Sequence, residues 1–356
     1  MERELRLMKG NEAVAEAAIR AGADGYFGYP ITPQSEILEY LMEANPYQTT
    51  GMVVLQAESE VAAINMVYGG AACGKKVLTT SSSPGISLMQ EGISYIAGAE
   101  LPCLVVNVVR GGPGLGTIQP AQSDYFQAVK GGGHGDYHLI VLAPSSVQEM
   151  ADFVGLGFDL AFKYRNPVMI LSDGAIGQMM EKVWLSPYRE RSKTVPDWAT
   201  TGKLPSRQRN IITSLELNPE RQEEFNRKLI NKYNEIKEKE VRYEEFQCED
   251  AEYLFVAYGT SARVCQKSVQ IARNEGLKAG LLRPVTLFPF PSERIGTLSG
   301  RAKIILSVEM SSGQMLEDVL LSVNGEVPVY HFGRMGGIVT TPEEVVDFLK
   351  LKIMGG

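Results

Sequence analysis

The sequence has few of the residues that bind metal ions and iron–sulfur clusters, with 4 cysteines and 3 histidines among 356 residues. The cysteines include no Cys-x-x-Cys pair and lie at Cys73, Cys103, Cys248 and Cys265. Because zinc sites and iron–sulfur clusters need several such ligands at close spacing, we expect neither in this chain. Free thiols are typical of a reducing compartment. The histidines also lack metal-like spacing, and we expect structural roles for His134, His138 and His331.

The sequence also lacks an excess of positive charge and any long apolar run. Its formal net charge is −7, which argues against a nucleic-acid or anionic-membrane partner. No stretch approaches the ~20 apolar residues of a membrane-spanning helix, and no N-terminal segment resembles a signal peptide. We therefore expect a cytoplasmic protein that does not contact membranes or nucleic acids.

What the sequence does contain is a regular alternation of helical and strand patterns up to about residue 173. Helices are predicted at residues 11–21, 34–44, 59–73, 86–99 and 145–164. Strands are predicted at residues 52–55, 76–80, 104–109, 139–142 and 168–171, with the first of these buried. Strands separated by helices of this length predict a parallel α/β sheet. Asn11 is expected to cap the first helix and Gly22 to end it.

Residues 174–250 interrupt this alternation. Prolines punctuate a polar stretch, and residues 221–244 then show a charged helical pattern with opposite charges three and four apart. We interpret that helix as a solvated connector, with contact to a partner as the alternative. A second α/β pattern follows, in which Thr341 caps a last helix and Pro342 takes its first position. The expected domains are residues 1–180, 181–250 and 251–356.

Polar and glycine-rich motifs follow an apolar strand that ends before Tyr29 and the predicted strands at 52–55, 76–80 and 104–109. They are Tyr-Pro-Ile-Thr-Pro at 29–33, Gln-Ala-Glu-Ser-Glu at 56–60, Thr-Thr-Ser-Ser-Ser-Pro-Gly at 79–85, and Arg-Gly-Gly-Pro-Gly-Leu-Gly at 110–116. In a doubly wound sheet the carboxyl ends of parallel strands lie at one edge, where ligands bind. We therefore expect the four motifs to converge on a single site.

Arg110 is the cation of these motifs and, with the nearby hydroxyls, suits a ligand that carries a carboxylate. The glycines after it would let a ligand approach the backbone closely, although the sequence has no P-loop pattern for phosphate. Each candidate also has a purely structural interpretation. Arg110 could form a surface salt bridge, Thr32 could serve at a helix entry, and Glu60 could favour the positive end of a helix.

The order of these motifs resembles the 2-oxoacid:ferredoxin oxidoreductases. More closely, the chain is similar to the α subunit of the branched-chain (2-oxoisovalerate) and 2-oxoglutarate members. The resemblance extends from Lys9 through the C-terminal α/β unit, and residues 93–136 are its most family-like part. It implies a pyrimidine-binding domain of a thiamine-diphosphate enzyme, with helices on both faces of a parallel sheet. A transketolase C-terminal-like α/β domain is then expected to follow.

The resemblance also implies a catalytic glutamate, which protonates the aminopyrimidine ring of thiamine diphosphate in these enzymes. Glu58 and Glu60 are both candidates. The family pattern is Ser-Glu with a glycine nine residues later in the same helix, and Ser59-Glu60 with Gly69 fits it. Glu60 is therefore expected to be the catalytic residue and to be partly desolvated, which would help it hold or share a proton.

Two further residues, Thr32 and Arg110, fall on the family's contacts with the 2-oxoacid carboxylate. A buried guanidinium paired with that carboxylate would orient the substrate for attack at its keto carbon. The resemblance also places six residues at the cofactor: Pro30, Ile31, Glu60, Ser82, Ser83 and Pro84.

One motif of thiamine-diphosphate enzymes is absent, the Gly-Asp-Gly with a downstream Asn that holds the diphosphate and Mg²⁺. The resemblance therefore implies that a β subunit supplies this half of the site. It also implies γ and ferredoxin-like δ subunits, iron–sulfur clusters outside this chain, and ferredoxin as electron acceptor. Coenzyme A would collect the acyl group as a co-substrate, and loops 259–261 and 333–337 could contact it or a partner.

The substrate is expected to be a branched-chain 2-oxoacid. The 2-oxoglutarate members tend to read Ser-Thr-Gly-Leu-Pro-Thr after Arg-Gly-Gly-Pro, whereas this chain continues with residues 114–120, Gly-Leu-Gly-Thr-Ile-Gln-Pro. The alternatives are a 2-oxoglutarate enzyme, half of a thiamine-dependent decarboxylase, and a non-catalytic docking subunit. The second α/β domain argues against a short decarboxylase half, and the joint presence of Thr32, Glu60 and Arg110 argues against mere docking.

Overall fold

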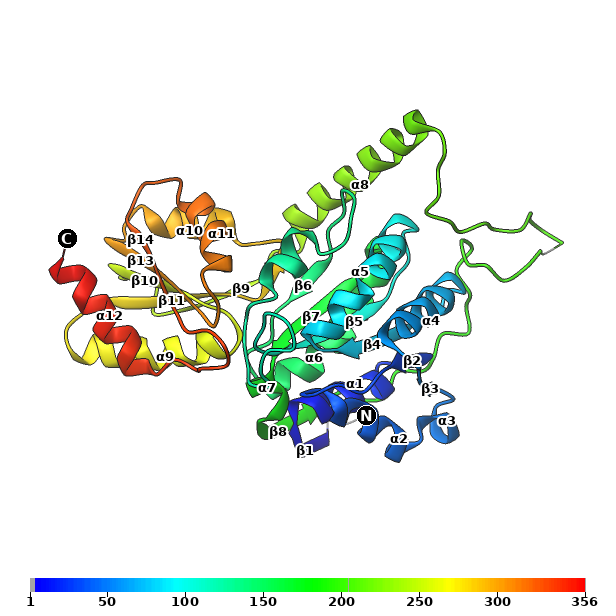
Figure 1. Ribbon diagram of the computed structural model, residues 1–356, viewed down its shortest axis with the longest axis horizontal. Helices are drawn as coiled ribbons and strands as arrows, with labels where there is room; N and C mark the ends of the chain where they lie inside the picture. Colours follow the sequence, from blue (N-terminus) through cyan, green and yellow to red (C-terminus); the bar gives the residue numbers. More distant parts are fainter. Residues whose placement is uncertain (1–3, 204, 356) are drawn as a thin grey trace.

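The computed structural model describes residues 4–203 and 205–355, so Met1 and Gly356, the outer limits of the expected domains, lie outside this part. Two α/β units lie side by side in it (Figure 1). The larger unit is built on a seven-stranded sheet. In spatial order its strands are β12 (Thr286–Phe288), β6 (Ile140–Leu142), β7 (Val168–Asp173), β5 (Leu104–Val109), β4 (Val77–Ser81), β2 (Gly25–Gly28) and β3 (Val53–Gln56).

All neighbouring strands from β6 to β3 are parallel, and β12 alone pairs antiparallel, which confirms the predicted α/β class. The covering helices are α1 (Gly10–Arg20), α2 (Ser35–Ala44), α3 (Pro46–Thr49), α4 (Glu60–Ala72), α5 (Ser83–Gly98), α6 (Val147–Tyr164) and α7 (Gly174–Gln178). The connections β3-α4-β4 and β4-α5-β5 cross the sheet in one direction, and β6-α6-β7 crosses it in the other. Right-handed crossovers therefore place α4 and α5 on one face and α6 on the opposite face.

The smaller unit holds a five-stranded sheet. Its strands in spatial order are β14 (Val329–Gly333), β13 (Ile304–Glu309), β10 (Tyr253–Val256), β11 (Ala279–Pro284) and β9 (Tyr243–Phe246), of which only β9 is antiparallel. Its helices are α9 (Gly259–Asn274), α10 (Ser292–Ser299), α11 (Gln314–Val323) and α12 (Pro342–Met354). Helix α12 begins as predicted, because the Thr341 hydroxyl accepts from the Glu344 amide in a capping box.

The segment predicted as a connector differs from the expectation. Helix α8 (Pro219–Lys239) ends at Lys239, whereas the helix was predicted to reach residue 244. The prediction was wrong at this end because residues 243–246 form β9, which pairs with β11 of the second sheet. The helix is also not solvated all round, since Leu229, Tyr233 and Ile236 are buried and Lys232 pairs with Glu100 of the larger unit. Strands β1 (Glu4–Lys9) and β8 (Met180–Leu185) form an antiparallel pair that the pattern analysis missed.

Two local predictions were also wrong. Lys9, not Asn11, is the N-cap of α1, because the buried Asn11 amide donates to the carbonyl of Pro33 (2.7 Å) and to Glu36 (3.0 Å). Strand β3 is largely exposed rather than buried, because it is the edge strand and has a neighbour only in β2. An apolar edge strand leaves both side chains and backbone groups open to another chain.

The two units are joined by a buried carboxylate, Asp173, at the carboxyl end of β7. It caps α7 through the amides of Ala175 (3.0 Å) and Ile176 (3.2 Å). It also accepts from the amide (3.2 Å) and hydroxyl (2.7 Å) of Thr260 at the start of α9. Burial raises the pKa of this carboxyl, and these hydrogen bonds act in the opposite direction. Asp173 thus ties the first turn of α9 to the main sheet.

Replacing Asp173 with alanine should lower the free energy of unfolding by about 2–4 kcal/mol, since it removes a cap and leaves buried donors unpaired. Urea denaturation of the full-length variant measures this loss. Asp159→Ala is the matched control, because Asp159 pairs with Arg189 on the surface and both side chains are about half exposed. That variant should lose less than about 1 kcal/mol. Equal losses in the two variants would contradict the assigned role of Asp173.

Candidate functional site

Arg110 lies directly after β5 and is almost completely buried, with 8% of its surface exposed. Its Nη1 donates to the carbonyl of Thr32 at 3.0 Å, and its Nη2 donates to the carbonyl of Leu115 at 3.2 Å. Its Nε is buried and has no hydrogen-bond partner among the described residues. A buried guanidinium that makes no ion pair among the described residues, and whose Nε donor is unpaired, is suited to an anionic ligand. Within the described residues, Arg110 therefore does not form the surface salt bridge that was the alternative interpretation.

The segment Ser81–Gly85 links the predicted residues into one site. The Ser82 hydroxyl donates to the carbonyl of Val108 at 2.8 Å, next to the end of β5. The Ser83 hydroxyl accepts from the Arg110 amide at 3.1 Å and donates to the Arg110 carbonyl at 3.3 Å. Pro84 takes an early position in α5, where a proline is tolerated. The predicted residues Thr32, Ser82, Ser83 and Arg110 are therefore brought together.

Glu60 is the first residue of α4, where Ser59 caps the helix by accepting from the Ala62 amide at 3.2 Å. The Glu60 side chain is buried, with 7% of the residue exposed. Glu58 is exposed and accepts from the Ser59 hydroxyl at 2.7 Å. Of the two candidate carboxylates, the buried one at a helix N-terminus is therefore Glu60, and this geometry supports the choice made from the motif.

Gly85 keeps space open beside Glu60. A Cβ atom at this position would lie 2.1 Å from Ser81 Oγ and 2.6 Å from Glu60 Oε1, closer than real contacts allow. The Ser81 hydroxyl and the Glu60 carboxylate therefore face the same small space. The hydroxyls of Ser81 and of Thr79, two residues earlier on β4, are buried without hydrogen-bond partners among the described residues. Unpaired buried polar groups at strand ends indicate where a polar ligand would bind.

Gly85→Ala should reduce turnover about tenfold or more, because the added methyl group must displace the Glu60 side chain. The steady-state kcat of the assembled enzyme measures this effect. Gly155→Ala serves as the control in α6, since its added Cβ would meet only Arg189, at 3.5 Å. The control should keep normal turnover. Normal turnover in Gly85→Ala would contradict the prediction that Glu60 is the catalytic carboxylate.

The Tyr-Pro-Ile-Thr-Pro turn rests on a buried polar chain that the sequence analysis missed. Thr80 donates to Gln34 Oε1 at 2.5 Å and also hydrogen-bonds Tyr26 at 2.8 Å. Gln34 in turn donates to the Tyr29 carbonyl at 3.2 Å. Burial raises the pKa of Tyr26 to about 12, so its hydroxyl keeps its proton. A buried network of neutral polar groups thus holds the turn in place through Gln34.

The predicted residues of the turn itself are at least partly exposed to solvent. Pro30 and Thr32 are exposed and Ile31 is half-buried. The Thr32 hydroxyl makes no hydrogen bond within the described residues, whereas its carbonyl accepts from Arg110. The structure therefore brings Thr32 to Arg110 through the backbone and leaves the hydroxyl available to a ligand.

A half-buried carboxyl near Arg110, Asp124, was also missed. It accepts from the Asn107 amide at 2.9 Å, and Asn107 itself lies inside the buried strand β5. Burial raises the pKa of Asp124, and hydrogen bonds from Asn107 and Ser83 partly offset this rise. One signal was present in the sequence, since an asparagine inside an apolar strand must find a polar partner.

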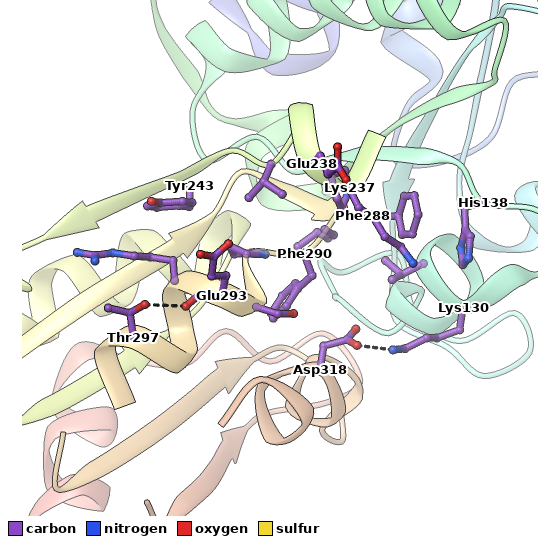
Figure 2. Close-up of a pocket in the computed structure, with 17 residues that line it drawn as sticks. Lys130, His138, Lys237, Glu238, Tyr243, Phe288, Phe290, Glu293, Thr297 and Asp318 are labelled. Carbon is purple, nitrogen blue, oxygen red and sulfur yellow. Dashed lines mark hydrogen bonds and ion pairs between the residues drawn. The ribbon is translucent and has the colours of Figure 1, made fainter. Parts of the chain in front are cut away.

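A pocket of about 960 Å³ lies at the junction of the two units and does not include the predicted site residues (Figure 2). Its lining includes Lys130, His138, Lys237, Phe288, Phe290 and Asp318. His138 stacks on Phe288 with ring centroids 4.2 Å apart, and burial lowers its pKa, so a neutral packing role fits it. The candidate site is therefore the polar cluster at the strand ends.

The arrangement can bind a group that offers ring nitrogens to Glu60 and an acid that offers a carboxylate to Arg110. Three features fit the aminopyrimidine of thiamine diphosphate. The Glu60 carboxylate has no hydrogen-bond partner among the described residues, the hydroxyls of Ser81 and Thr79 are unpaired among them, and Gly85 leaves space. Glu60 and Ser81 would hold that ring, and Arg110 would hold a substrate beside it. The cysteines contribute nothing here, since Cys73 is exposed and Cys103, Cys248 and Cys265 are buried free thiols.

Two protein families match the chain over adjacent ranges. "Pyruvate flavodoxin/ferredoxin oxidoreductase, thiamine diP-bdg" matches residues 16–245, and "Pyruvate:ferredoxin oxidoreductase core domain II" matches residues 251–345. "Ketoisovalerate oxidoreductase subunit VorB" of Methanothermobacter marburgensis is 54% identical and covers 93% of each chain. The subunit of the same name from Methanothermobacter thermautotrophicus is 52% identical over 97% of each chain. "2-oxoglutarate synthase subunit KorA" of Archaeoglobus fulgidus is 38% identical over 98% of this chain and 99% of the relative.

Solved structures agree with these relatives. A 2-oxoglutarate:ferredoxin oxidoreductase from Magnetococcus marinus, with 2-oxoglutarate, coenzyme A and succinyl-CoA bound, superposes with a TM-score of 0.87 at 29% identity. The match covers 99% of this chain and 66% of that one. A split gene transketolase shares the fold, with a TM-score of 0.61 at 13% identity. The chain therefore belongs to the pyruvate flavodoxin/ferredoxin oxidoreductase family, with a thiamine-diphosphate-binding domain followed by core domain II.

Proposed function

We propose that this chain is the α subunit of a thiamine-diphosphate-dependent 2-oxoacid:ferredoxin oxidoreductase. The complex would convert a branched-chain 2-oxoacid, of the 2-oxoisovalerate type, and coenzyme A to an acyl-CoA and CO₂, with electrons passing to ferredoxin. The observation that carries this proposal is the buried Arg110, whose free Nε lies in the same cluster of strand ends as the buried Glu60. The expected domain limits at residues 180 and 250 and a cytoplasmic location are part of the proposal.

The residues of this chain would bind and orient the reactants. Glu60 would hold a proton at the aminopyrimidine ring, where its burial keeps water away from the carboxylate. Arg110 would fix the substrate carboxylate, and the Thr32 hydroxyl would add a second contact. Pro30, Ile31, Ser82, Ser83 and Pro84 would shape the surface against which the ring packs. Thiamine diphosphate, when bound, supplies the carbon nucleophile that attacks the keto group.

A partner subunit is needed because this chain holds half of such a site. The sequence has no Gly-Asp-Gly for the diphosphate and Mg²⁺, so we propose that a β subunit supplies them. Exposed apolar side chains lie on β3, α4 and α5, next to Glu60: Val53, Leu55, Val61, Met66, Leu88 and Tyr95. Large apolar groups exposed on neighbouring elements are typical of a surface that another chain covers. The γ and ferredoxin-like δ subunits would carry the electron-transfer clusters.

The choice of substrate rests on the relatives. The two ketoisovalerate oxidoreductase subunits are 54% and 52% identical to this chain, whereas the 2-oxoglutarate synthase subunits reach 38%. The loop after Arg110 also carries two exposed aliphatic side chains, Leu115 and Ile118, and no additional cation. A second carboxylate, as in 2-oxoglutarate, would call for a further cation, so the loop favours an aliphatic substrate.

Co-purification of the chain from its host, followed by viologen-reduction assays with a panel of 2-oxoacids, tests this proposal. We expect a co-purifying chain with a Gly-Asp-Gly motif, and a kcat/KM for 2-oxoisovalerate at least about tenfold above that for 2-oxoglutarate. A preference for 2-oxoglutarate would replace the branched-chain assignment with the alternative. A complete complex that reduces viologen with none of these acids would leave the chain as a docking subunit.

A further inference from the structure

The five residues from Gln122 to Phe126 lie between the substrate site and the smaller unit. Gln122 is buried, donates to the Tyr258 carbonyl (2.8 Å), and accepts from Ser261 (2.7 Å) and from the Met310 amide (2.9 Å). These three partners all belong to the smaller unit. The N-terminal end of the segment is therefore fixed to that unit before the chain reaches Asp124.

The rest of the segment is held by helix α11 of the smaller unit. The side-chain amide of Gln314 donates to the backbone carbonyl of Ser123 at 2.7 Å and accepts from the backbone N–H of Phe126 at 2.8 Å. One side chain therefore holds both ends of the turn that contains Asp124. Tyr125 donates to Asp318 at 2.5 Å, and Asp318 also pairs with Lys130 (Figure 2). Asp124 is thus flanked on both sides by residues anchored to the smaller unit.

Asp124 itself faces the other way, toward the substrate site. Its carboxylate accepts from Asn107 at 2.9 Å, and the Ser83 hydroxyl lies close enough to lower the pKa of this carboxyl. Because that hydroxyl accepts from the Arg110 amide at 3.1 Å, its own proton is free for the Asp124 carboxylate or the Arg110 carbonyl. Asp124 therefore lies beside the hydroxyl that holds the backbone of Arg110.

Packing alone does not account for a carboxylate at this position. Asp124 makes no ion pair among the described residues, and its charge is compensated by hydrogen bonds from neutral groups. A half-buried carboxylate without a cation costs stability relative to a neutral residue of similar size. Its position one hydroxyl away from Arg110 gives it a use, since a fixed backbone limits the positions that the guanidinium can take.

We propose that Asp124 is a positioning residue for the Arg110 guanidinium, and that Gln314 of the smaller unit holds Asp124 in register. The inference rests on the proposed contact of Arg110 with the substrate carboxylate. The smaller unit would then contribute to oxoacid binding without touching the oxoacid. The contacts that would link this unit to Arg110 lead from Gln314 to the turn at Asp124, and from there to the Ser83 hydroxyl and Arg110.

Steady-state kinetics of the assembled enzyme with 2-oxoisovalerate test the proposal. Asp124→Asn should raise KM about tenfold and change kcat by less than about twofold, because a misplaced guanidinium weakens ground-state and transition-state binding alike. Gln314→Met should raise KM about threefold to fivefold from within the smaller unit, since it removes both hydrogen bonds to the turn at similar volume. Glu317→Gln is the control on α11, because Glu317 is exposed and should leave both constants unchanged.

Amide hydrogen exchange at Arg110 provides a readout that does not depend on catalysis. In both variants the Arg110 amide, which donates to Ser83, should exchange at least about fivefold faster, while amides in β4 and β7 keep their rates. An unchanged KM and unchanged exchange in Asp124→Asn and Gln314→Met would overturn the inference. If Arg110→Ala nevertheless raised KM, the proposed function would stand without it. If Arg110→Ala left KM unchanged, the proposed function itself would fail.

Discussion

Glu60→Gln should abolish decarboxylation, with a loss in kcat of about a thousandfold, while the complex still assembles. Glutamine has nearly the shape of glutamate but cannot exchange a proton with the aminopyrimidine ring, and general acid–base steps contribute about 10²–10⁴-fold. The structural cost is small, because the lost charge at the first turn of α4 stabilises the helix by only about 0.3–1 kcal/mol. Viologen reduction by the purified complex measures the loss.

Glu58→Gln is the matched control, since Glu58 lies two residues earlier, is exposed and contacts only the Ser59 hydroxyl within the described residues. It should keep turnover within about twofold of the unmodified enzyme. Gel filtration of both variants checks that the subunits remain together. Near-normal turnover in Glu60→Gln would contradict the assignment of Glu60 as the catalytic residue. A large loss of turnover in Glu58→Gln alone would indicate that Glu58 is the catalytic residue.

Arg110→Ala is expected to raise KM for the 2-oxoacid by about 10- to 100-fold, with a smaller effect on kcat. Hydrogen bonds to charged groups contribute about 1.5–3 kcal/mol, and the substrate carboxylate would lose its cation. Because this contact forms in the ground state as well as in the transition state, its loss appears mainly in KM. Initial rates over a wide range of 2-oxoisovalerate concentrations measure the change.

Arg110→Lys separates charge from geometry, since lysine keeps the charge but cannot donate to Thr32, Leu115 and a substrate from one planar group. It should restore only part of the lost affinity. Arg263→Ala is the control, because Arg263 forms a partly exposed ion pair with Glu181 away from the site and should leave KM unchanged. An unchanged KM in Arg110→Ala would mean that the guanidinium only holds the two carbonyls.

Much of the larger unit was predictable because its elements follow local patterns. The strand at 104–109 and the ends of most helices were predicted to within a few residues, since apolar periodicity and cap residues act over short distances. The errors share a cause. Asn11 was expected as a cap because asparagine caps helices, but a partner more than 20 residues away binds its side chain. Likewise, an apolar run cannot indicate whether its strand lies at the centre or at the edge of a sheet.

The candidate site was predictable where residues follow strands and not where they come from long loops. Thr32, Ser83 and Arg110 follow parallel strands, so topology alone implied that they would meet. Asp124 lies in the long connection between β5 and β6, which has no repeating pattern from which its position could be derived. Its neighbours Asn107 and Ser83 are 17 and about 40 residues away, and only the fold brings them together.

The sequence by itself determined the class of fold, the order of the motifs and the absence of a Gly-Asp-Gly motif. These properties depend on local periodicity, turn residues and the presence or absence of short motifs. The tertiary structure decided that Glu60 is buried while Glu58 is exposed, and that the Nε donor of Arg110 is unpaired among the described residues. It also decided that the smaller unit holds the turn that contains Asp124, near Arg110. These features depend on contacts between distant segments, which form only when the whole chain packs and which no local pattern encodes.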